Sequence, residues 1–560
     1  MLSYIDLMEK VLTAYSEDDI LNYVRRVEEK GLEEHGFPRL TANIGILISH
    51  GRQTQLKEIF IHMMDLCCAE IPVSLIKNGK RAGNDFSVKE IVLCLMEAEK
   101  AGFAGEEKIS QWKDALKKLD PNKTYSAIAK NPPEPMGNWA AFAAASEQLR
   151  KYAGLGNETA FIENQVGSQL FSFDENGMYR DPDQPIVYDI ATRLQLAVAL
   201  HFGFDGNCRS DLEENLLKSA DITLKMQSVT GEIPFGGRSN QFLHNEAFYA
   251  AICEFYAGWF RKLGDLRKAG MFKRAAKIAT YSVLPWLSGE KIRHIKNGYP
   301  TDSMIGCEDY AYFDKYMITT ASWFYLAHIM SDDTVQEFPC PSENENYICQ
   351  TSEWFHKVFV KYRDYFVEFD TDADTHYDAA GIGRIHRKGV FPTVCLSVPF
   401  AKSPLYKTET VNPSGFSISG GIIKNGTRFT GWDSSVKYRL TEKSVTGDSA
   451  IVKFECTSEG EFLFSESCKI TDGYVEIAVN GEGTAEIYFP ALLSDGENYS
   501  KTTCTGNCVE IGFNESLCRY SASDNVTDLN LMYSNRNGKY RSFSVSGKNE
   551  VRLRIELLRQ

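Results

Sequence analysis

The chain changes its sequence pattern at one polar run, Ser331-Asp332-Asp333-Thr334-Val335-Gln336-Glu337-Phe338-Pro339-Cys340-Pro341-Ser342-Glu343-Asn344-Glu345-Asn346. Before this run, apolar residues recur at the spacing of helices. After it, short runs alternate between apolar and polar residues and are separated by Gly, Asn and Asp turns. A block of helices followed by a block of strands favours two domains packed against each other over a doubly wound fold.

The length of the chain also requires more than one hydrophobic core. Cores stop growing at roughly 250 to 300 residues, and this chain has 560. We predict a helical domain over residues 1–335, a linker over 336–356 and an antiparallel β-sandwich over 357–560. About a dozen helices in sequence favour an (α/α) toroid of about six helix hairpins, whose loops surround one central cleft.

The composition excludes several classes of function. With 61 basic and 75 acidic residues, the net charge is −14, and the chain lacks the basic surface of a nucleic-acid-binding protein. The N-terminus shows no basic start and apolar run of a signal peptide, and no run of about eighteen apolar residues predicts a membrane span. The 14 cysteines follow no disulfide framework, so we expect a cytoplasmic protein, and large cytoplasmic proteins commonly form homodimers.

The richest polar segment runs from Pro234 to Glu246, just before an apolar helix. Its glycine pair, Gly236-Gly237, allows a tight turn. The residues after the pair supply a cation, amides, an imidazole and a carboxylate: Arg238, Asn240, Gln241, His244, Asn245 and Glu246. These are the parts of an acid–base site, so we interpret the segment as the mouth of an active site in the helical domain. The alternative is a capped helix start whose polar groups satisfy the loop.

Two other segments place polar residues at helix starts. Gly137-Asn138-Trp139 opens an Ala-rich helix, where Asn138 is a candidate binding residue or a simple N-cap. Tyr188, Asp189 and Arg193 lie near the start of another helix. Because Asp189 and Arg193 are spaced i, i+4, a helix-stabilising ion pair is an equally good interpretation of these two.

A further segment, Cys307-Glu308-Asp309-Tyr310, precedes a tyrosine-rich helix. Glu308 and Tyr310 lie at its loop end and are the expected functional pair. Tyr312 and Tyr316 share a helix face, and we expect both in the core.

In its organisation and in these motifs, the chain resembles carbohydrate-active enzymes of the heparinase II/III-like and alginate-lyase-like families, which consist of an (α/α) toroid followed by an antiparallel β-sandwich. The resemblance spans nearly the whole chain. The chain is also similar to rhamnosyl-glucuronate lyases and to glucuronidases of toroidal fold. The resemblance therefore implies an enzyme that acts on a uronate-containing oligosaccharide, with no nucleic-acid or membrane partner.

Uronate lyases of this architecture cleave by β-elimination, in which the C5 proton beside the carboxylate is removed and the C4 oxygen leaves. Such a site needs groups that neutralise the carboxylate, together with a base and an acid. The candidate neutralisers are Asn138, Arg238, Asn240 and Gln241, with His244 as the base and Tyr310 as the acid. Further substrate contacts are expected from Tyr188, Asp189, Arg193 and Asn245.

Glycoside hydrolysis, the alternative reaction, needs two carboxyl groups across the scissile bond. Glu246 and Glu308 are the candidate pair, with Asp189 and Asp309 in reserve. We favour a lyase because His, Tyr and amide side chains are concentrated in these segments. A cytoplasmic enzyme meets imported oligosaccharides and not polymers, so we expect exo action on short chains.

A non-catalytic glycan-binding protein is the remaining alternative. Such a protein would present exposed aromatic platforms, whereas Trp259, Trp286 and Trp323 lie in apolar helical sequence. We expect no metal and no organic cofactor, because no Gly-rich phosphate loop follows a strand and no Cys or His set has the spacing of a zinc site.

Overall fold

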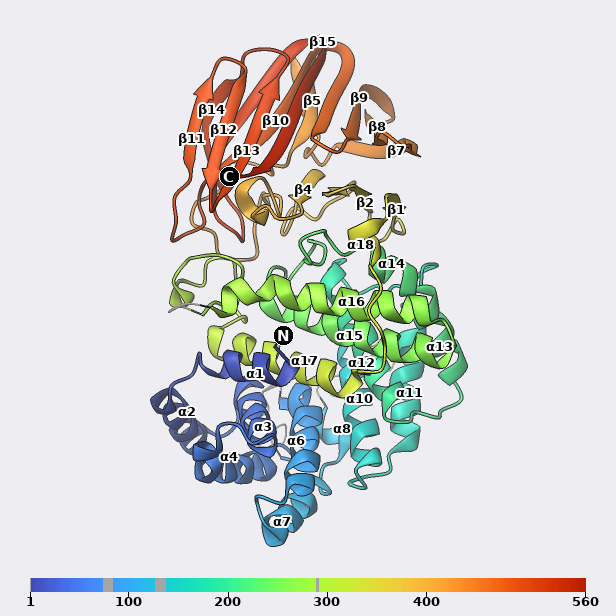
Figure 1. Cartoon of the computed structure of the whole chain (residues 1–560), viewed down its shortest axis with the longest axis vertical. Helices are drawn as coiled ribbons and strands as arrows, with labels where there is room; N and C mark the ends of the chain where they lie inside the picture. The colour runs from blue at the N-terminus through green and yellow to red at the C-terminus, as the bar shows by residue number, and fades with distance from the viewer. Residues whose placement is uncertain (1, 74–83, 126–136, 289–291) are drawn as a thin grey trace.

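A computed structural model describes residues 2–73, 84–125, 137–288 and 292–560. Figure 1 shows a helical half and, above it, two layers of β-sheet that follow it in the chain. The predicted order of helices first and antiparallel sheets second is therefore confirmed.

Six helices form a closed ring in the described part of the helical half. Each of them contacts the next along the chain, and the last contacts the first. The inner helices are α3 (Gly36–Ser49), α6 (Val88–Ala101), α10 (Trp139–Tyr152), α12 (Ile186–His201), α15 (Leu243–Lys262) and α17 (Phe313–Met330). The helical half is thus the (α/α) toroid that the sequence predicts.

A second helix packs on the outside of each inner helix. These outer helices are α4 (Lys57–Glu70), α7 (Glu106–Leu116), α11 (Thr159–Leu170), α13 (Arg209–Lys218), α16 (Leu266–Val283) and α1 (Tyr4–Leu12). Five of the pairs are hairpins of consecutive helices, as predicted. The sixth pairs α17 with the N-terminal α1, because the chain leaves the toroid for the sheets after α17.

Shorter helices connect or flank this ring. They are α2 (Glu17–Lys30), α8 (Pro121–Thr124), α14 (Ala220–Lys225), α18 (Pro341–Asn344), η1 (Thr54–Leu56), η2 (Asn84–Ser87), η3 (Leu284–Leu287), η4 (Thr301–Ser303) and η5 (Pro392–Val394). Within the described ranges, no helix combines the length and the apolar character needed to cross a membrane.

Local sequence explains how helices begin and how closely they pack. Ser3 and Ser16 form capping boxes with Asp6 and Asp19, and these boxes start α1 and α2. The alanines of α10 are buried between α6 and α12. Because an alanine side chain is small, the neighbouring inner helices can approach α10 from both sides.

The first sheet has four antiparallel strands in the order β1-β2-β3-β4. These are β1 (Tyr347–Gln350), β2 (Lys357–Tyr362), β3 (Tyr365–Asp370) and β4 (Gly381–Arg387). Strand β1 pairs with β2 although it lies inside the segment 336–356, which the sequence analysis assigned to a linker. The strand was missed because it has only four residues and lies between the end of α18 at Asn344 and an irregular loop that begins after Gln350.

The second sheet has eleven strands among the described residues, in the order β11-β12-β13-β15-β10-β9-β8-β7, with β14 beside β15, and with β5 and β6 joined to β10. Its strands are β5 (Ser419–Lys424), β6 (Thr427–Thr430), β7 (Val436–Val445), β8 (Ala450–Ser458), β9 (Glu461–Ile470), β10 (Val475–Ser494), β11 (Lys501–Thr505), β12 (Cys508–Phe513), β13 (Ser516–Ala522), β14 (Thr527–Ser534) and β15 (Lys539–Arg559). Long strands β10 and β15 pair along most of their lengths and form the centre of the sheet.

The four-stranded sheet lies between the toroid and the larger sheet (Figure 1). Phe359 and Phe366 belong to the hydrophobic core of the toroid. Val358, Val360 and Val367 point the other way and belong to the core shared with the larger sheet. Both faces of this sheet are therefore covered, and every residue of β2 and β3 is buried.

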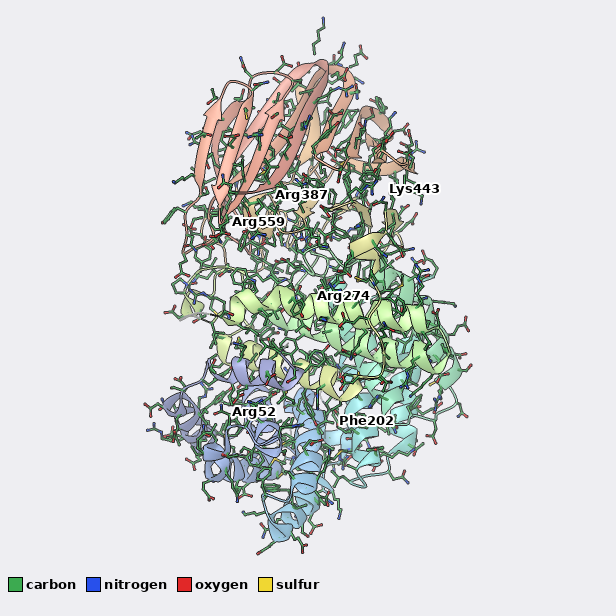
Figure 2. The ribbon with its side chains drawn as sticks, in the orientation of Figure 1. Arg52, Phe202, Arg274, Arg387, Lys443 and Arg559 are labelled. Atoms are coloured by element: carbon green, nitrogen blue, oxygen red, sulfur yellow. The ribbon has the colours of Figure 1, made fainter. Side chains whose placement is uncertain are left out.

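The connection between the two halves is fixed to the toroid by ion pairs. Arg274 on α16, labelled in Figure 2, contacts Glu337 and Glu343 of the segment that leads to the sheets. Deeper in the interface, Arg384 of β4 donates a hydrogen bond of 2.7 Å to the carbonyl of Ile233. The sheets thus reach directly to the loop that precedes α15.

Candidate active site

A cavity of about 630 Å³ opens inside the ring of inner helices. Residues of α3, α10, α12, α15 and α17 line it, together with the loops before α12, α15 and α17. Six residues that the sequence analysis selected lie on its wall: Asn138, Tyr188, Arg238, His244, Asn245 and Tyr310. The structure therefore brings together side chains from four separate segments of the sequence.

The loop before α15 has a backbone that few sequences can adopt. Gly236 and Gly237 have φ values of 140° and 74°. A Cβ at Gly237 would lie 2.5 Å from Cα of Pro185, so this position requires glycine for space as well as for conformation. The amide of Gly237 donates to Asp378 of the sheet region at 2.8 Å, which holds the turn in place.

Ser239 follows in the same loop and also has a left-handed backbone, with φ at 58°. Its amide donates to Glu308 at 2.6 Å, and its carbonyl accepts from the side chain of Asn245 at 3.1 Å. Its hydroxyl lies 3.0 Å from the hydroxyl of Tyr310 and 3.1 Å from that of Tyr188. Ser239 therefore connects two of the tyrosines on the wall of the cavity.

His244 lies in the first turn of α15, stacked on Phe242 and edge-on to Tyr316. The residue is 7% exposed. Its Nδ1 is buried without a hydrogen-bond partner among the described residues, and the residue lines the cavity. Burial, with Arg39 and His294 nearby, lowers the pKa of His244 to about 3, so its imidazole is neutral at physiological pH.

Arg238 is tied to the rim of the cavity by several contacts. It forms an ion pair with Asp181, donates to the carbonyl of Pro182 at 2.8 Å and lies over the ring of Tyr188 at 4.6 Å. Burial raises the pKa of Asp181 to about 6, although the Arg238 guanidinium acts in the opposite direction. The cation is thus positioned, and its position depends on a carboxyl group that titrates near neutral pH.

Two amides complete the polar wall. Asn138 precedes α10 and is buried, but its side chain forms no capping hydrogen bond. Asn138 thus occupies the N-cap position without capping the helix through its side chain, and it lines the cavity. Asn245 uses its side-chain nitrogen to hold Ser239, as described above, and its buried oxygen has no partner within the described residues.

Tyr310 lies at the mouth of the cavity and is 40% exposed. Burial of part of the side chain, with Tyr188 and the Glu308 carboxylate nearby, raises the pKa of Tyr310. The phenol is therefore protonated at physiological pH and can act as a proton donor.

Asp189 and Arg193 lie outside the cavity. They form a fully buried ion pair of 2.6 Å on α12, and Arg193 also donates to Ser219 and Thr223. Of the two interpretations given above, the structure supports the helix-stabilising ion pair. Both residues face the packing between α12, α14 and α15, where substrate cannot reach them.

Glu246 and Glu308 also lie outside the cavity and are buried. Glu246 pairs with Lys296 at 2.6 Å. Glu308 accepts from Ser239, as described above, and pairs with Arg536 at 2.7 Å. Each carboxylate is thus bound by a cation behind the cavity wall, and the predicted catalytic pair does not face a substrate.

Asn240 and Gln241 turn away from the cavity as well. Asn240 donates to the carbonyl of Pro234 at 3.2 Å and accepts from Gln241 at 2.9 Å. Gln241 accepts from Asn537 of the sheet region at 3.1 Å. These two amides stabilise the loop and its contact with the sheets.

Several residues on the cavity wall were not identified from the sequence. They are Glu33, Glu34, His35, Arg39, Phe86, Trp139, Phe142, Asp181, Ser239, Phe248, Lys315, Tyr316 and Trp323. Tyr316 was expected in the core together with Tyr312, but Tyr316 lines the cavity and Tyr312 is 56% exposed. Both lie at the N-terminal end of α17, and the buried residues of this helix begin only at Met317.

Arg39 is the most informative of these omissions. It is buried in α3 and donates to Thr319 of α17 at 2.8 Å. No motif surrounds it in the sequence, and only the closure of the ring between α17 and α3 brings it to the cavity.

Within the described ranges, no group of three or more His, Cys, Asp or Glu side chains is arranged to hold a metal ion.

Comparison with known proteins gives similarities of structure only. No protein-family model matches the chain, and no curated protein matches it significantly. A mutant of heparan sulfate lyase HepC from Pedobacter heparinus is similar at 11% identity, with 94% of this chain and 76% of that chain covered and a TM-score of 0.49. A structure of heparinase III is similar at 10% identity, with 93% and 76% covered and a TM-score of 0.47.

A mutant of chondroitin AC lyase from Streptomyces coelicolor A3 is similar at 10% identity, with 100% of this chain and 83% of that chain covered and a TM-score of 0.41. At such identities no residue role can be transferred. The roles proposed below therefore follow from the geometry and chemistry of the cavity.

Proposed function

We propose that the chain is a lyase that cleaves a uronate-containing glycan by β-elimination in the cavity of the toroid. The observation that carries the proposal is the convergence of an imidazole, phenols, amides and a guanidinium on one cavity wall. The carboxylates predicted for hydrolysis, Glu246 and Glu308, are bound by cations outside that wall. The groups that a β-elimination needs are present, and the predicted pair that a hydrolysis needs is not.

In this proposal, Asn138, Asn245 and Arg238 bind the uronate carboxylate. Hydrogen bonds to the carboxylate stabilise the charge that develops when the neighbouring C5 proton leaves. Phe142, Phe248 and Trp323 also line the cavity, and apolar side chains that exclude water strengthen these interactions.

His244 takes the C5 proton in this scheme. Its imidazole is neutral at physiological pH, so a lone pair is available for the proton. A bound carboxylate close to the ring raises the pKa of His244 from its low value and makes the imidazole a stronger base when substrate is present.

Tyr310 donates a proton to the departing C4 oxygen. Its phenol is protonated and lies at the mouth of the cavity, where a chain that extends from a bound uronate would leave. His244 and Tyr310 thus act on opposite ends of the bond pair that breaks in the elimination.

The size of the cavity favours a short substrate. A volume of about 630 Å³ lies within the range of pockets for small molecules. We therefore include exo action on short oligosaccharides in the proposal, as expected for an enzyme that meets imported fragments in the cytoplasm.

Hydrolysis is the second candidate, and one observation favours it. Asp181 lines the cavity and has its pKa raised to about 6, which suits a general acid. Its ion pair with Arg238 occupies the carboxylate, however, so elimination remains the function that the geometry supports best.

The test is mass spectrometry of the products from glucuronate-, iduronate-, mannuronate- and galacturonate-containing oligosaccharides, incubated with the full chain in heavy-oxygen water. A lyase gives a product that is one water lighter than the hydrolytic product and absorbs in the ultraviolet through its C4=C5 double bond. A saturated product that carries heavy oxygen would overturn the proposal in favour of a hydrolase. The His244→Ala variant serves as the control for a contaminating activity.

A further inference from the structure

Ser239 occupies the point where two phenols of the cavity meet. Its hydroxyl is 3.0 Å from that of Tyr310 and 3.1 Å from that of Tyr188. Tyr310 comes from the loop before α17 and Tyr188 from the first turn of α12. A single serine oxygen therefore connects two phenols that come from different elements, and Tyr316 of α17 lies within hydrogen-bonding reach of the same oxygen.

The backbone of Ser239 is fixed on both sides of that hydroxyl. Glu308 accepts its amide and Asn245 donates to its carbonyl, so both polar groups of its main chain are bound by buried side chains. Its left-handed φ of 58° is uncommon for a residue other than glycine. Such conformations persist where the surrounding structure holds them, and they cluster at functional sites.

The hydrogen-bonding capacity of the three hydroxyls leaves the direction of the chain open. A serine hydroxyl has one proton to donate and two lone pairs to accept. If the Ser239 hydroxyl accepts from Tyr188 and donates to Tyr310, the hydrogen bonds of the three hydroxyls all point from Tyr188 towards Tyr310. The opposite direction forms the same number of hydrogen bonds. Two equivalent arrangements of one chain are the requirement for a proton to pass along it.

We propose that Ser239 is a positioning residue that couples Tyr188 to Tyr310 and restores the proton that Tyr310 loses in each turnover. This inference rests on the proposed function, in which Tyr310 is the acid. Neither the serine nor the coupling is required by the elimination itself, since an isolated tyrosine exposed to solvent can also donate a proton.

Three proton transfers make up the proposed relay. Tyr310 gives its proton to the C4 oxygen, whose bond to the sugar breaks, and becomes a phenolate. The Ser239 hydroxyl transfers its proton to that phenolate and at the same time takes the proton of Tyr188. The negative charge ends on Tyr188. After the product leaves, the proton that His244 took from C5 is released to water and water supplies a proton to Tyr188, so both groups return to their starting states.

The charge distribution favours transfer in that direction. Arg238 lies over the ring of Tyr188 at 4.6 Å, and its guanidinium counteracts the rise that burial causes in the pKa of Tyr188. Burial and the Glu308 carboxylate raise the pKa of both Tyr310 and Tyr188, so the difference between the two phenols comes from Arg238 against the ring of Tyr188. A phenolate is thus better stabilised on Tyr188 than on Tyr310.

The first experiment measures the coupling without any substrate. 3-Fluorotyrosine is placed at position 310 of the full chain, and its fluorine NMR resonance is compared among four proteins: the parent, Ser239→Ala, Tyr188→Phe and the double variant. We expect each single variant to shift the resonance, and Tyr188→Phe to add nothing when Ser239 is already replaced. Tyr312→Phe, an exposed neighbour in sequence, is the matched control that leaves the resonance in place.

An unchanged resonance in Tyr188→Phe would overturn the proposal. A shift caused by Tyr188→Phe that is equally large with Ser239 present and with Ser239 replaced by alanine would overturn it as well. If Ser239→Ala does not fold, Ser239→Gly removes the same hydroxyl and adopts a positive φ readily. This result is obtained whether or not the chain is a lyase, so the coupling and the proposed function fail separately.

The second experiment uses turnover of whichever oligosaccharide of the uronate panel proves to be a substrate. Ser239→Ala should lower kcat about tenfold to a hundredfold with little change in KM. A plot of kcat against the deuterium fraction of the solvent should be curved in the parent, where several protons move together, and linear in Ser239→Ala. A loss of kcat with the curvature retained would show that Ser239 supports the structure only, and would overturn the relay.

Discussion

Arg536, in the turn between β14 and β15, donates a hydrogen bond of 2.7 Å to Glu308, which lies before α17 in the toroid. The two residues are 228 positions apart, and both are buried. Glu308 in turn accepts the amide of Ser239. A residue of the turn between β14 and β15 therefore supports the loop that carries Arg238 and Ser239 and leads into α15 at His244.

Replacing Arg536 by methionine should destabilise the protein by about 3 to 5 kcal/mol, because a buried carboxylate then loses its cation. Urea unfolding measures the change. Adding Glu308→Gln to this variant should recover part of the loss, since the glutamine carries no charge and can still accept from Ser239. A double variant as unstable as the sum of the two single variants would show that the ion pair does not hold the loop.

Replacing His244 by glutamine should lower kcat by about two to four orders of magnitude, because the proposed base is lost while most of the volume is kept. KM should change little, and circular dichroism should match the parent. His201→Gln, at the exposed end of α12, is the matched control and should keep full activity. Retained turnover in His244→Gln would remove the histidine from the mechanism.

The pH profile of kcat/KM should show an acidic limb near pH 6. Asp181 has a pKa of about 6, so its carboxylate holds Arg238 above that pH and releases it as the pH falls through 6. Asp181→Asn should have low activity at every pH and no such limb. Asp183→Asn replaces the exposed second contact of Arg238 and should keep the limb. An acidic limb that is still present in Asp181→Asn would show that the limb does not come from the titration of Asp181.

Glu466 should make the stability of the sheets depend on pH. It is fully buried, accepts from the amide of Gly420 at 2.6 Å, and its burial raises its pKa to about 7. Because the folded state holds this proton more tightly than the unfolded state, the stabilisation is complete below the ordinary pKa and is lost as the pH rises through 7.

Glu466→Gln should remove this dependence. Relative to the parent, the variant should gain about 3 kcal/mol in unfolding free energy between pH 4.5 and pH 8, at about 1.4 kcal/mol for each pH unit. Denaturant unfolding at several pH values gives the difference, with the exposed Glu461→Gln as control. Parallel curves for parent and variant would contradict the raised pKa.

The fold could be predicted because its signals are local and repeated. Helical spacing and strand alternation persist over long stretches on either side of the polar run at 331–346, and each hairpin adds to the evidence. The strand Tyr347–Gln350 was missed because four residues give too short a pattern. The pairing of α17 with α1 was missed because it joins the two ends of the helical half.

The candidate site could be predicted only in part. Successive residues of a helix point about 100° apart, so His244 and Asn245 line the cavity while Glu246 turns to Lys296. The sequence shows which residue types are present but not which face each occupies. Arg39 lacked any signal, because an arginine within an apolar helix becomes part of a site only when the ring closes.

The four-stranded sheet, covered on both faces, restricts how far the sheets can move away from the toroid, and so how a glycan could enter the cavity of the proposed lyase. To swing the sheets away from the toroid, the chain would have to bring Phe359 and Phe366 into water and break the bonds that Asp378 and Arg384 make to the loop before α15. We therefore do not expect the two halves to open and close around a glycan. For the proposed lyase, this means that a glycan enters and leaves through the mouth of the cavity while the sheets stay packed on the toroid.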